Sequence, residues 1–166
     1  MKVRLANVAD ATGIADAQIR CWRWAYRGIL RDDFLDGLAV EGKSADWRAV
    51  LEAPEAAVWV GEMEGAVQGM IVAAPAHWAD MPVNGMVRTF YIAPEAAGKG
   101  LGRRLWAEAQ EYLRLCGHDG MYVMVMEANG IGRGFYEKIG GVRHHGDFVI
   151  ALDGVEQADC CYYWRF

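Results

Sequence analysis

Residues 90–105 read FYIAPEAAGKGLGRRL. Pro94 ends an apolar, strand-like run, and Leu101 opens a segment whose apolar residues recur at helical spacing. Small residues at 96, 97, 98, 100 and 102 leave backbone N–H groups uncovered where that helix begins. Such a turn binds anions through its free amides and the positive end of the helix dipole. We therefore predict a phosphate site, for which Lys99, Arg103 and Arg104 supply positive charge.

Two common glycine-rich signatures do not fit this turn. A Walker A loop carries Ser or Thr after its Lys, whereas Gly100 follows Lys99. The dinucleotide fingerprint is G-x-G-x-x-G, whereas residues 98–102 follow the pattern G-x-G-x-G. Two alternatives stay open: a tight connection with packing glycines, and a nucleotide-binding protein that uses the turn for ATP.

The bulk composition predicts a single globular domain over residues 1–166. The chain is 54% apolar and 23% charged, an ordinary globular mixture, and its length suits one full core. Its net charge is −5 with a pI near 5.3, which disfavours a nucleic-acid partner and suits a cationic substrate such as an amine.

The chain shows no sign of a membrane, metal or disulfide role. Its start lacks the apolar core of a signal peptide, and no run of about 18 apolar residues could span a bilayer. The cysteines Cys21, Cys116, Cys160 and Cys161 form neither CxxC nor a Cys/His cluster with zinc spacing. We expect reduced thiols in a cytoplasmic protein without a metal site.

Hydrophobic periodicity predicts strands alternating with helices. We expect strands or hairpin arms over 2–5, 57–63, 66–74, 85–93, 120–128, 141–152 and 157–166, with turns at Glu64-Gly65 and Asp153-Gly154. We expect helices over 10–26, 31–38, 44–51 and 102–117 and a short one capped by Asn129; Asp10 caps the first, and Pro54 ends the third. This order predicts an α/β fold with a mixed, mostly antiparallel sheet of about seven strands flanked by helices.

A second informative segment, residues 127–141, reads EANGIGRGFYEKIGG. Ile131, Phe135 and Ile139 share one stripe of the short helix, which places Phe135 in the core. Tyr136 lies about 100° further round the helix, so its ring points elsewhere. From the residues alone, Tyr136 is an interfacial tyrosine with a satisfied hydroxyl.

Together the two segments resemble the GNAT superfamily of N-acetyltransferases. Its central motif runs strand, Pro, Gln/Arg-Gly-x-Gly-x-Gly/Ala and helix, which residues 90–105 match. Its second motif, an Asn followed six residues later by Phe-Tyr and then Gly, is matched by Asn129, Phe135, Tyr136 and Gly140. The resemblance extends to WRWAYRGIL, the hairpin VWVGEMEGAVQGMIVAA and the final YYWRF. It implies the acyl-CoA N-acyltransferase (GNAT) fold, and that the phosphate is the pyrophosphate of coenzyme A.

The sequence departs from the family pattern at two places. Ala97 stands where members carry Gln or Arg, so a side-chain contact to the pyrophosphate is lost while the backbone N–H is kept. A strand glutamate that acts as base in some members would fall near Met86 or Val87, and neither can accept a proton.

The resemblance implies acetyl-CoA as the cofactor and direct attack by a primary amine in a ternary complex. Pantetheine would pair with the backbone of Phe90, Tyr91 and Ile92, and the Ile92 N–H would polarise the thioester carbonyl. The remaining cofactor-binding residues are Ala97, Gly98, Lys99, Gly100, Leu101, Gly102, Arg103, Asn129 and Tyr136.

The resemblance implies that Tyr136 is the catalytic acid, a role open to a phenol, which is protonated at neutral pH and can donate to the departing sulfur. A base is also useful, because only about one amine molecule in 10³ is neutral at pH 7. Glu127, at the end of its strand, is the catalytic base that we predict; His77 is a second candidate, and His144 and His145 are weaker ones.

The resemblance also implies an acceptor site at the end of the first helix. Trp24 and Tyr26, with His77 from a loop, are the predicted substrate-binding residues, and Trp22 is either a further wall or core. Acidic neighbours such as Asp32, Asp33 and Asp36 would suit a cation with an apolar body. The acceptor is a small-molecule or peptide amine, and whether it is a polyamine, an amino acid, a drug or a protein N-terminus stays open. A non-catalytic acyl-CoA-binding module and a homodimer through the aromatic last strand are also open.

Overall fold

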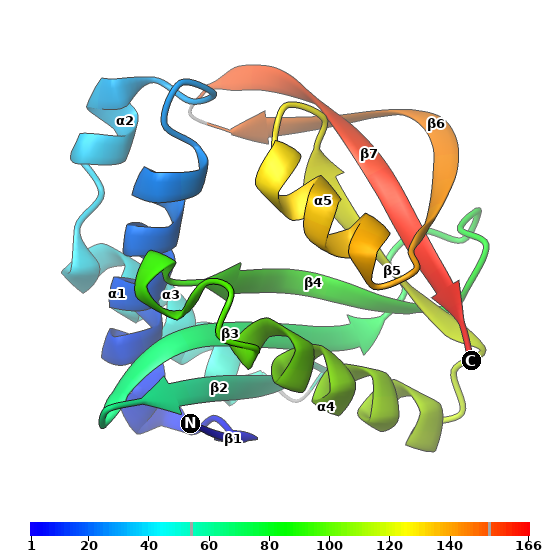
Figure 1. The fold of residues 1–166 in the computed structure, drawn as a ribbon, viewed down its shortest axis with the longest axis horizontal. Helices are drawn as coiled ribbons and strands as arrows, with labels where there is room; N and C mark the ends of the chain where they lie inside the picture. The colour runs from blue at the N-terminus through cyan, green and yellow to red at the C-terminus, as the bar shows by residue number, and fades with distance from the viewer. Residues whose placement is uncertain (54, 153) are drawn as a thin grey trace.

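The computed structural model describes residues 1–53, 55–152 and 154–166, arranged around one twisted sheet (Figure 1). Pro54 and Asp153, where the sequence predicts a helix end and part of a turn, lie outside the described residues. The strands follow the order β1-β2-β3-β4-β5-β7-β6. They are β1 (Lys2–Leu5), β2 (Ala57–Met63), β3 (Ala66–Pro75), β4 (Gly85–Ile92), β5 (Gly120–Met126), β6 (Val142–Leu152) and β7 (Val155–Arg165).

The pairing confirms a mixed, mostly antiparallel sheet. β4 and β5 pair parallel, and the five other neighbouring pairs are antiparallel. The predicted β2–β3 turn is confirmed: Glu64 and Gly65 both adopt positive φ, 54° and 80°, as a two-residue hairpin turn requires.

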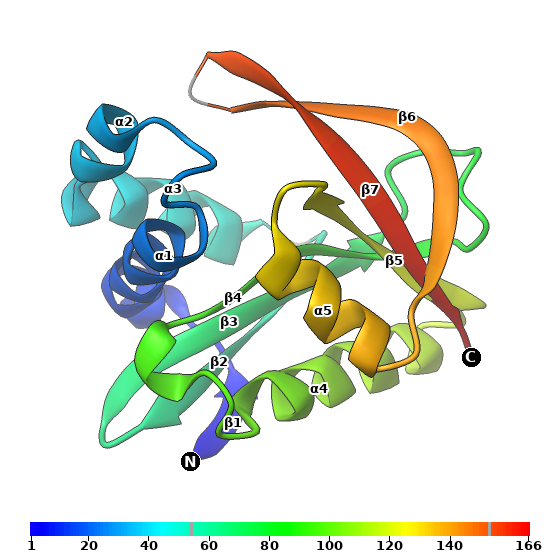
Figure 2. The same cartoon turned by 45° about the horizontal axis from the view of Figure 1, so that its top comes forward.

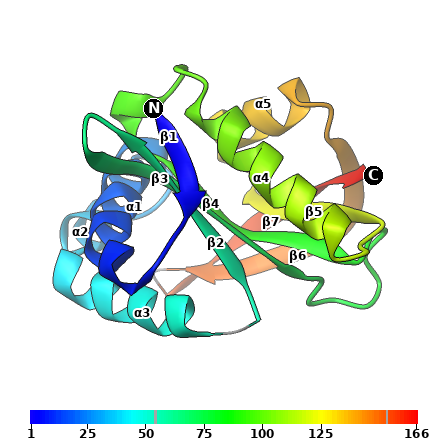
Figure 3. The ribbon, with the colours of Figure 1, turned by 90° about the horizontal axis from the view of Figure 1, so that it is seen from below.

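Helices cover both faces of the sheet. α4 (Leu101–Leu115) and α5 (Gly130–Lys138) pack on one face, and α1 (Ala11–Ala25), α2 (Asp32–Asp36) and α3 (Val40–Glu52) on the other (Figure 3). Two short 3-10 turns, η1 (Val8–Asp10) and η2 (Pro94–Ala96), precede α1 and α4. No helix in the described part of the chain is long and apolar enough to cross a bilayer.

The helices stay on the sheet through apolar side chains at helical spacing. On α4, Leu101, Leu105 and Leu113 are fully buried against the sheet. On the opposite face, Ile14 of α1 and Trp47 of α3 pack over the central strands. Each such side chain contributes about 1.5–3 kcal/mol through burial, so the two layers hold the sheet from both sides.

The start of α1 differs from the sequence-based expectation. Asp10 makes no capping hydrogen bond to α1. Instead Asn7 caps the preceding 3-10 turn by accepting from the Ala9 N–H, and the Asp10 carboxylate accepts from the Asn7 N–H at 2.8 Å. The same carboxylate pairs with Arg4 at 2.7 Å, which holds the pKa of Asp10 below its usual value. Asp10 therefore joins β1 to the turn.

β4 carries one residue more than β3 opposite it. Val72 pairs with Thr89 and Ala73 pairs with Val87, so Arg88 is the extra residue of a β-bulge. Parallel pairing of β4 with β5 is limited to three residues, the last being Val87 with Val123. Beyond the bulge the two strands diverge, as Figures 1 and 2 show.

The antiparallel β6–β7 ribbon extends beyond the end of β5. β7 pairs with β5 from Asp159 onward, whereas its first residues pair with β6 alone. The far end of the ribbon reaches toward α2 in Figures 1 and 2, and Leu152 packs against the cluster formed by α1 and α2. The ribbon therefore bridges the open end between β4 and β5.

Gly120→Ala is expected to destabilise the closed end of the β4–β5 pair. A methyl group on Gly120 would overlap the Trp164 carbonyl oxygen and lie 2.5 Å from Val83 Cγ1. Overpacking against backbone costs about 1–3 kcal/mol, which urea unfolding would measure. Gly42→Ala in α3 is the control, because nothing lies within 4 Å of an added methyl there. An unfolding midpoint for Gly120→Ala equal to that of the parent would contradict this account.

Candidate active site

A cavity of about 440 Å³ occupies the space where β4 and β5 diverge. Its walls come from α1, β4, the glycine turn before α4, β5, α5 and the β6–β7 ribbon. Because strand pairing stops inside the sheet, the cavity is in contact with both faces of it.

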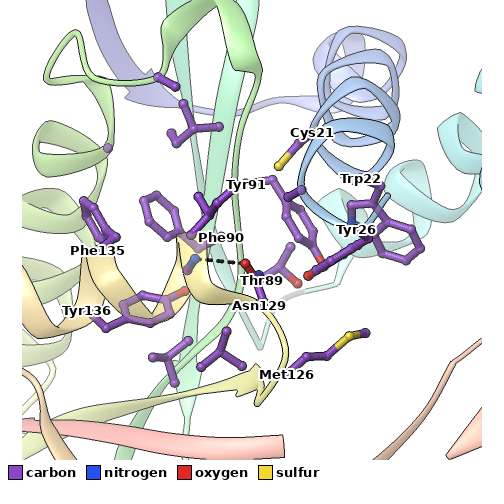
Figure 4. A pocket seen from close by; sticks show the side chains of 18 of the residues that line it. Cys21, Trp22, Tyr26, Thr89, Phe90, Tyr91, Met126, Asn129, Phe135 and Tyr136 are labelled. Carbon is purple, nitrogen blue, oxygen red and sulfur yellow. Dashed lines mark hydrogen bonds between the residues drawn. The ribbon is translucent and has the colours of Figure 1, made fainter. Parts of the chain in front are cut away.

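Side-chain alternation assigns the walls to two faces. Phe90 and Val125 point to the α4–α5 face, where Tyr136 also lies. Tyr91 and Met126 point to the α1 face, where they pack with Trp22. Figure 4 shows the same division, with α1 side chains on one side of β4 and Phe135 and Tyr136 on the other. The cavity therefore has two chambers joined through the opening between β4 and β5.

The glycine turn forms one end of the cavity. Gly98 and Gly100 have φ of 73° and 88°, left-handed values that glycine adopts without strain. Gly100 is the residue before α4, so uncovered N–H groups meet the positive end of a 15-residue helix there. A methyl at Gly102 would lie 3.3 Å from Phe90, so this glycine keeps the helix close to β4.

Some of the residues predicted to bind the cofactor at this turn line the cavity, and others do not. Ala97, Gly98, Gly100, Gly102 and Arg103 line the cavity. The side chain of Leu101 is fully buried in the core under α4, so only its backbone is available to a ligand. Lys99 is not among the lining residues.

The edge of β4 that faces the cavity presents free backbone groups. Ala93 donates its N–H to Gln68 of β3 at 2.8 Å. Antiparallel alternation then directs the Phe90 and Ile92 N–H groups away from β3, toward the gap where β5 no longer pairs. The Ile92 N–H lies near the Cys21 thiol and acts to lower its pKa. A linear polar ligand could pair with this edge as a strand would.

Tyr136 and Asn129 of the second motif both line the cavity. Asn129 caps α5 as predicted, its side-chain oxygen accepting from the Gly132 N–H at 2.9 Å. Burial raises the pKa of Tyr136 above its ordinary value, and the nearby Tyr91 and Cys21 add to this. Tyr136 is therefore protonated at neutral pH and can act as a proton donor.

The apolar stripe of α5 is placed differently from the expectation. Tyr136 is the buried residue, 5% exposed, whereas Ile131 is 50% exposed. Phe135 is half-buried and lines the cavity beside Phe90, with ring centroids 5.3 Å apart. The helix is rotated relative to the prediction because α5 packs Tyr136 against Trp106 of α4.

Trp24 and Tyr26 line the cavity, as does Trp22. Tyr26 and Trp22 are buried and Trp24 is 42% exposed, so α1 supplies both the inner wall and part of the rim. The predicted placement of His77 is wrong. His77 follows the last residue of β3, Pro75, and its backbone N–H donates to the Tyr122 hydroxyl. It is not among the lining residues.

Glu127 is unsuited to the role of base that the sequence predicts. It lies outside the cavity lining and pairs with Arg143 at 2.5 Å and Arg133 at 3.4 Å. Desolvation acts to raise its pKa, but hydrogen bonds with Cys160 and Arg143 and the charges of both arginines outweigh it. The pKa of Glu127 is therefore lowered, which makes it a weaker base. This prediction is corrected.

The other polar candidates from the sequence also lie outside the cavity lining. Asp32 and Asp36 pair with Arg27 at 2.8 Å on the exposed side of α2, and Asp33 pairs with Arg31 at 3.3 Å. His144 and His145 of β6 do not line the cavity either. The acidic groups next to α1 are thus occupied by surface arginines.

Asp159 of β7 is the site residue that sequence reasoning missed. It lines the cavity, and it pairs in register with Met126, which places it on the α1 face. Its Oδ1 is buried without a hydrogen-bond partner among the described residues, as is the Nε1 of Trp22. Burial raises the pKa of Asp159 to about 6. The available signal was a lone acid in the apolar stretch ADCCYYW.

Two solved structures share the fold of this chain. The PaiA N-acetyltransferase of Thermoplasma acidophilum, solved with coenzyme A, matches 100% of both chains at a TM-score of 0.73 and 18% identity. YncA of Salmonella typhimurium, a putative acetyltransferase solved with acetyl-CoA, matches 99% of this chain and 93% of its own at 0.66 and 20%.

The sequence matches the acetyltransferase (GNAT) family over residues 16–141, and the chain belongs to this family. A curated relative, the uncharacterized N-acetyltransferase YuaI of Bacillus subtilis, is 29% identical over 128 residues, which cover 76% of this chain and 72% of that protein. The resemblance inferred from the two motifs is thereby confirmed.

Asp159→Asn is expected to raise the melting temperature near pH 8 and to change it little near pH 4. The folded pKa of about 6 exceeds the ordinary 3.8, so between these values the folded chain holds a proton that the unfolded chain releases. Folding stability therefore falls as pH rises through this window, and an uncharged Asn removes the loss. Melting curves across this range, with the exposed Glu156→Gln as control, would measure it. A difference that does not vary with pH would contradict the assignment.

Proposed function

We propose that this protein transfers an acetyl group from acetyl-CoA to a primary amine by direct attack in a ternary complex. The observation that carries the proposal is the cavity that passes between β4 and β5, with an anion-binding turn in one chamber and aromatic walls in the other. Two substrates entering from opposite faces of the sheet would meet at the opening.

The residues of the α4–α5 chamber fit coenzyme A. The Gly98–Gly100 turn offers N–H groups and a helix dipole to the pyrophosphate, and Arg103 and Lys138 add positive charge to the lining. The free edge of β4 matches the amide groups of pantetheine. Ala97 lines the same turn, and its N–H donates to the Pro94 carbonyl at 3.2 Å.

The proposed reaction needs a donor for the oxyanion and a proton for the departing sulfur. Acetyl-CoA supplies the activated acetyl thioester. The Ile92 N–H, directed into the gap, is the donor for the developing oxyanion. Tyr136, kept protonated by burial, donates a proton to the sulfur as the carbon–sulfur bond breaks.

Direct attack is favoured over a covalent acetyl-cysteine route. Cys21 is the cysteine that lines the cavity, and it is 7% exposed. Desolvation raises the pKa of the Cys21 thiol to about 11, and the nearby Ile92 N–H offsets this only in part. The thiolate needed for nucleophilic attack is therefore scarce at neutral pH.

Thermal melts with acetyl-CoA, free coenzyme A and ATP, combined with a thiol-release assay, test the proposal. A ligand at about 100 times its dissociation constant stabilises the fold by about 2.7 kcal/mol, so a clear rise is expected with both coenzyme A forms and none with ATP. Stabilisation without thiol release from any amine would instead support the non-catalytic acyl-CoA-binding alternative. No stabilisation by either coenzyme A form would reject both.

Tyr136→Phe is expected to lower kcat by about 10²-fold, because it removes the proton donor to the sulfur. The acetyl-CoA-induced rise in melting temperature should be kept, since the aromatic packing against Trp106 remains. Tyr112→Phe is the matched control: Tyr112 is a tyrosine of α4 that packs on Trp59 and does not line the cavity. Full activity in Tyr136→Phe would remove Tyr136 from the mechanism.

A further inference from the structure

The α1 chamber of the cavity holds a negatively charged side chain, Asp159, and a positively charged side chain, Arg88. Among the described residues that line the cavity, Asp159 is the sole carboxylate. Arg88, the bulge residue of β4, is exposed and lines the same chamber. The aromatic and aliphatic walls include Trp22, Tyr26 and Met126, and Cys21 and Thr89 also line the cavity.

The surroundings of Asp159 leave its carboxylate without a partner. Its cross-strand neighbours are Met126 on β5 and Phe148 on β6, whose side chains carry no N–H or O–H donor. Oδ1 is buried and makes no hydrogen bond with the described residues. A buried carboxylate oxygen without a hydrogen bond is destabilising, so a ligand that supplies the missing donor would be favoured there.

We propose that Asp159 binds the ammonium group of the acceptor and removes its proton, and that the acceptor is a monoamine with an apolar body. This inference rests on the proposed acetyl transfer and assigns both the base and the acceptor class that the sequence left open. Asp159 thus takes the role that the sequence assigned to Glu127.

The chamber favours a single positive charge. An ammonium group can pair with Asp159 while the body of the acceptor lies against Trp22 and Tyr26, whose ring centroids are 5.7 Å apart. A second ammonium group, as in a polyamine, would meet the positive charge of Arg88 and no second carboxylate. The acids of α2 that would attract one are held by Arg27 and Arg31.

The proton balance of the step is complete. Asp159 takes one proton from the ammonium group and later releases it to solvent. The amine lone pair then forms the carbon–nitrogen bond, and the carbon–sulfur bond breaks. Tyr136 gives its proton to the sulfur and regains one from the attacking nitrogen, directly or through water, so the products are an amide, a thiol and one free proton.

Burial favours proton transfer from the ammonium group to Asp159 through its effect on both pKa values. It raises the pKa of Asp159 to about 6 and lowers the pKa of an amine in the same chamber, so the two values approach each other. The groups that face Asp159 or lie near it are Arg88 and Tyr91 on β4, Cys21 and Tyr26 on α1, and His144 on β6. Desolvation alone accounts for the shift. Asp159 is ionised above about pH 6, so kcat/KM should fall as pH drops through that value.

The test compares the parent, Asp159→Asn and Glu156→Gln in thiol-release assays with acetyl-CoA. Glu156 is an exposed acid of the same strand outside the cavity lining, so it is the matched control. The acceptors are 2-phenylethylamine and hexylamine as monoamines and spermidine as a polyamine, measured from about pH 5 to pH 9. Melting with acetyl-CoA checks that each variant is folded and binds the cofactor.

We expect the parent to use a monoamine with a kcat/KM at least about 10-fold above that for spermidine. Asp159→Asn should lose about 10²-fold in kcat/KM and the decline near pH 6, while keeping stabilisation by acetyl-CoA; Glu156→Gln should match the parent. Retention of activity within about 3-fold in Asp159→Asn, or preference for spermidine, would overturn the inference while leaving acetyl transfer intact. A parent that binds acetyl-CoA but acetylates no amine would reject the proposed function itself.

Discussion

The structure depends on the place where two parallel strands stop pairing. β4 and β5 approach closely at Gly85 and Gly120, where added methyl groups would collide with backbone oxygens. Three residues later the Arg88 bulge ends the pairing, and the backbone groups beyond it lose their strand partner. Buried N–H groups need hydrogen bonds, so this edge stays suited to a ligand that supplies them. The cavity and its two chambers follow from that one interruption.

The low polarity of the cavity acts on three acidic groups in the same direction, with different consequences. Burial raises the pKa values of Cys21, Tyr136 and Asp159. For Cys21 this suppresses the nucleophilic thiolate, and for Tyr136 it preserves a proton donor. For Asp159 it brings the titration close to neutrality, where a carboxylate can exchange protons with an amine. A single physical cause thus separates an inert thiol from the proposed acid and the proposed base.

Two buried polar atoms at the cavity wall lack hydrogen bonds with the described residues, which destabilises the folded protein. Trp22 Nε1 and Asp159 Oδ1 are buried without partners among the described residues, although both belong to residues that line the cavity. By contrast, the side-chain oxygen of Asn129 in the same wall accepts from the Gly132 N–H. Unsatisfied groups at a cavity wall are expected where a ligand completes the hydrogen bonding.

The sequence by itself determined the strands, the helices, the glycine turn and the Asn129 cap, because short-range hydrogen bonds and apolar periodicity specify them. The family resemblance singled out Tyr136 and Asn129, and both line the cavity. Only the tertiary structure decided which acid serves the cavity. Glu127 adjoins the motif in sequence, but β6 brings Arg143 against it, whereas Asp159 reaches the α1 chamber through β7 pairing with β5. Strand register over long sequence separation sets these contacts, and it rests on packing that no local pattern encodes.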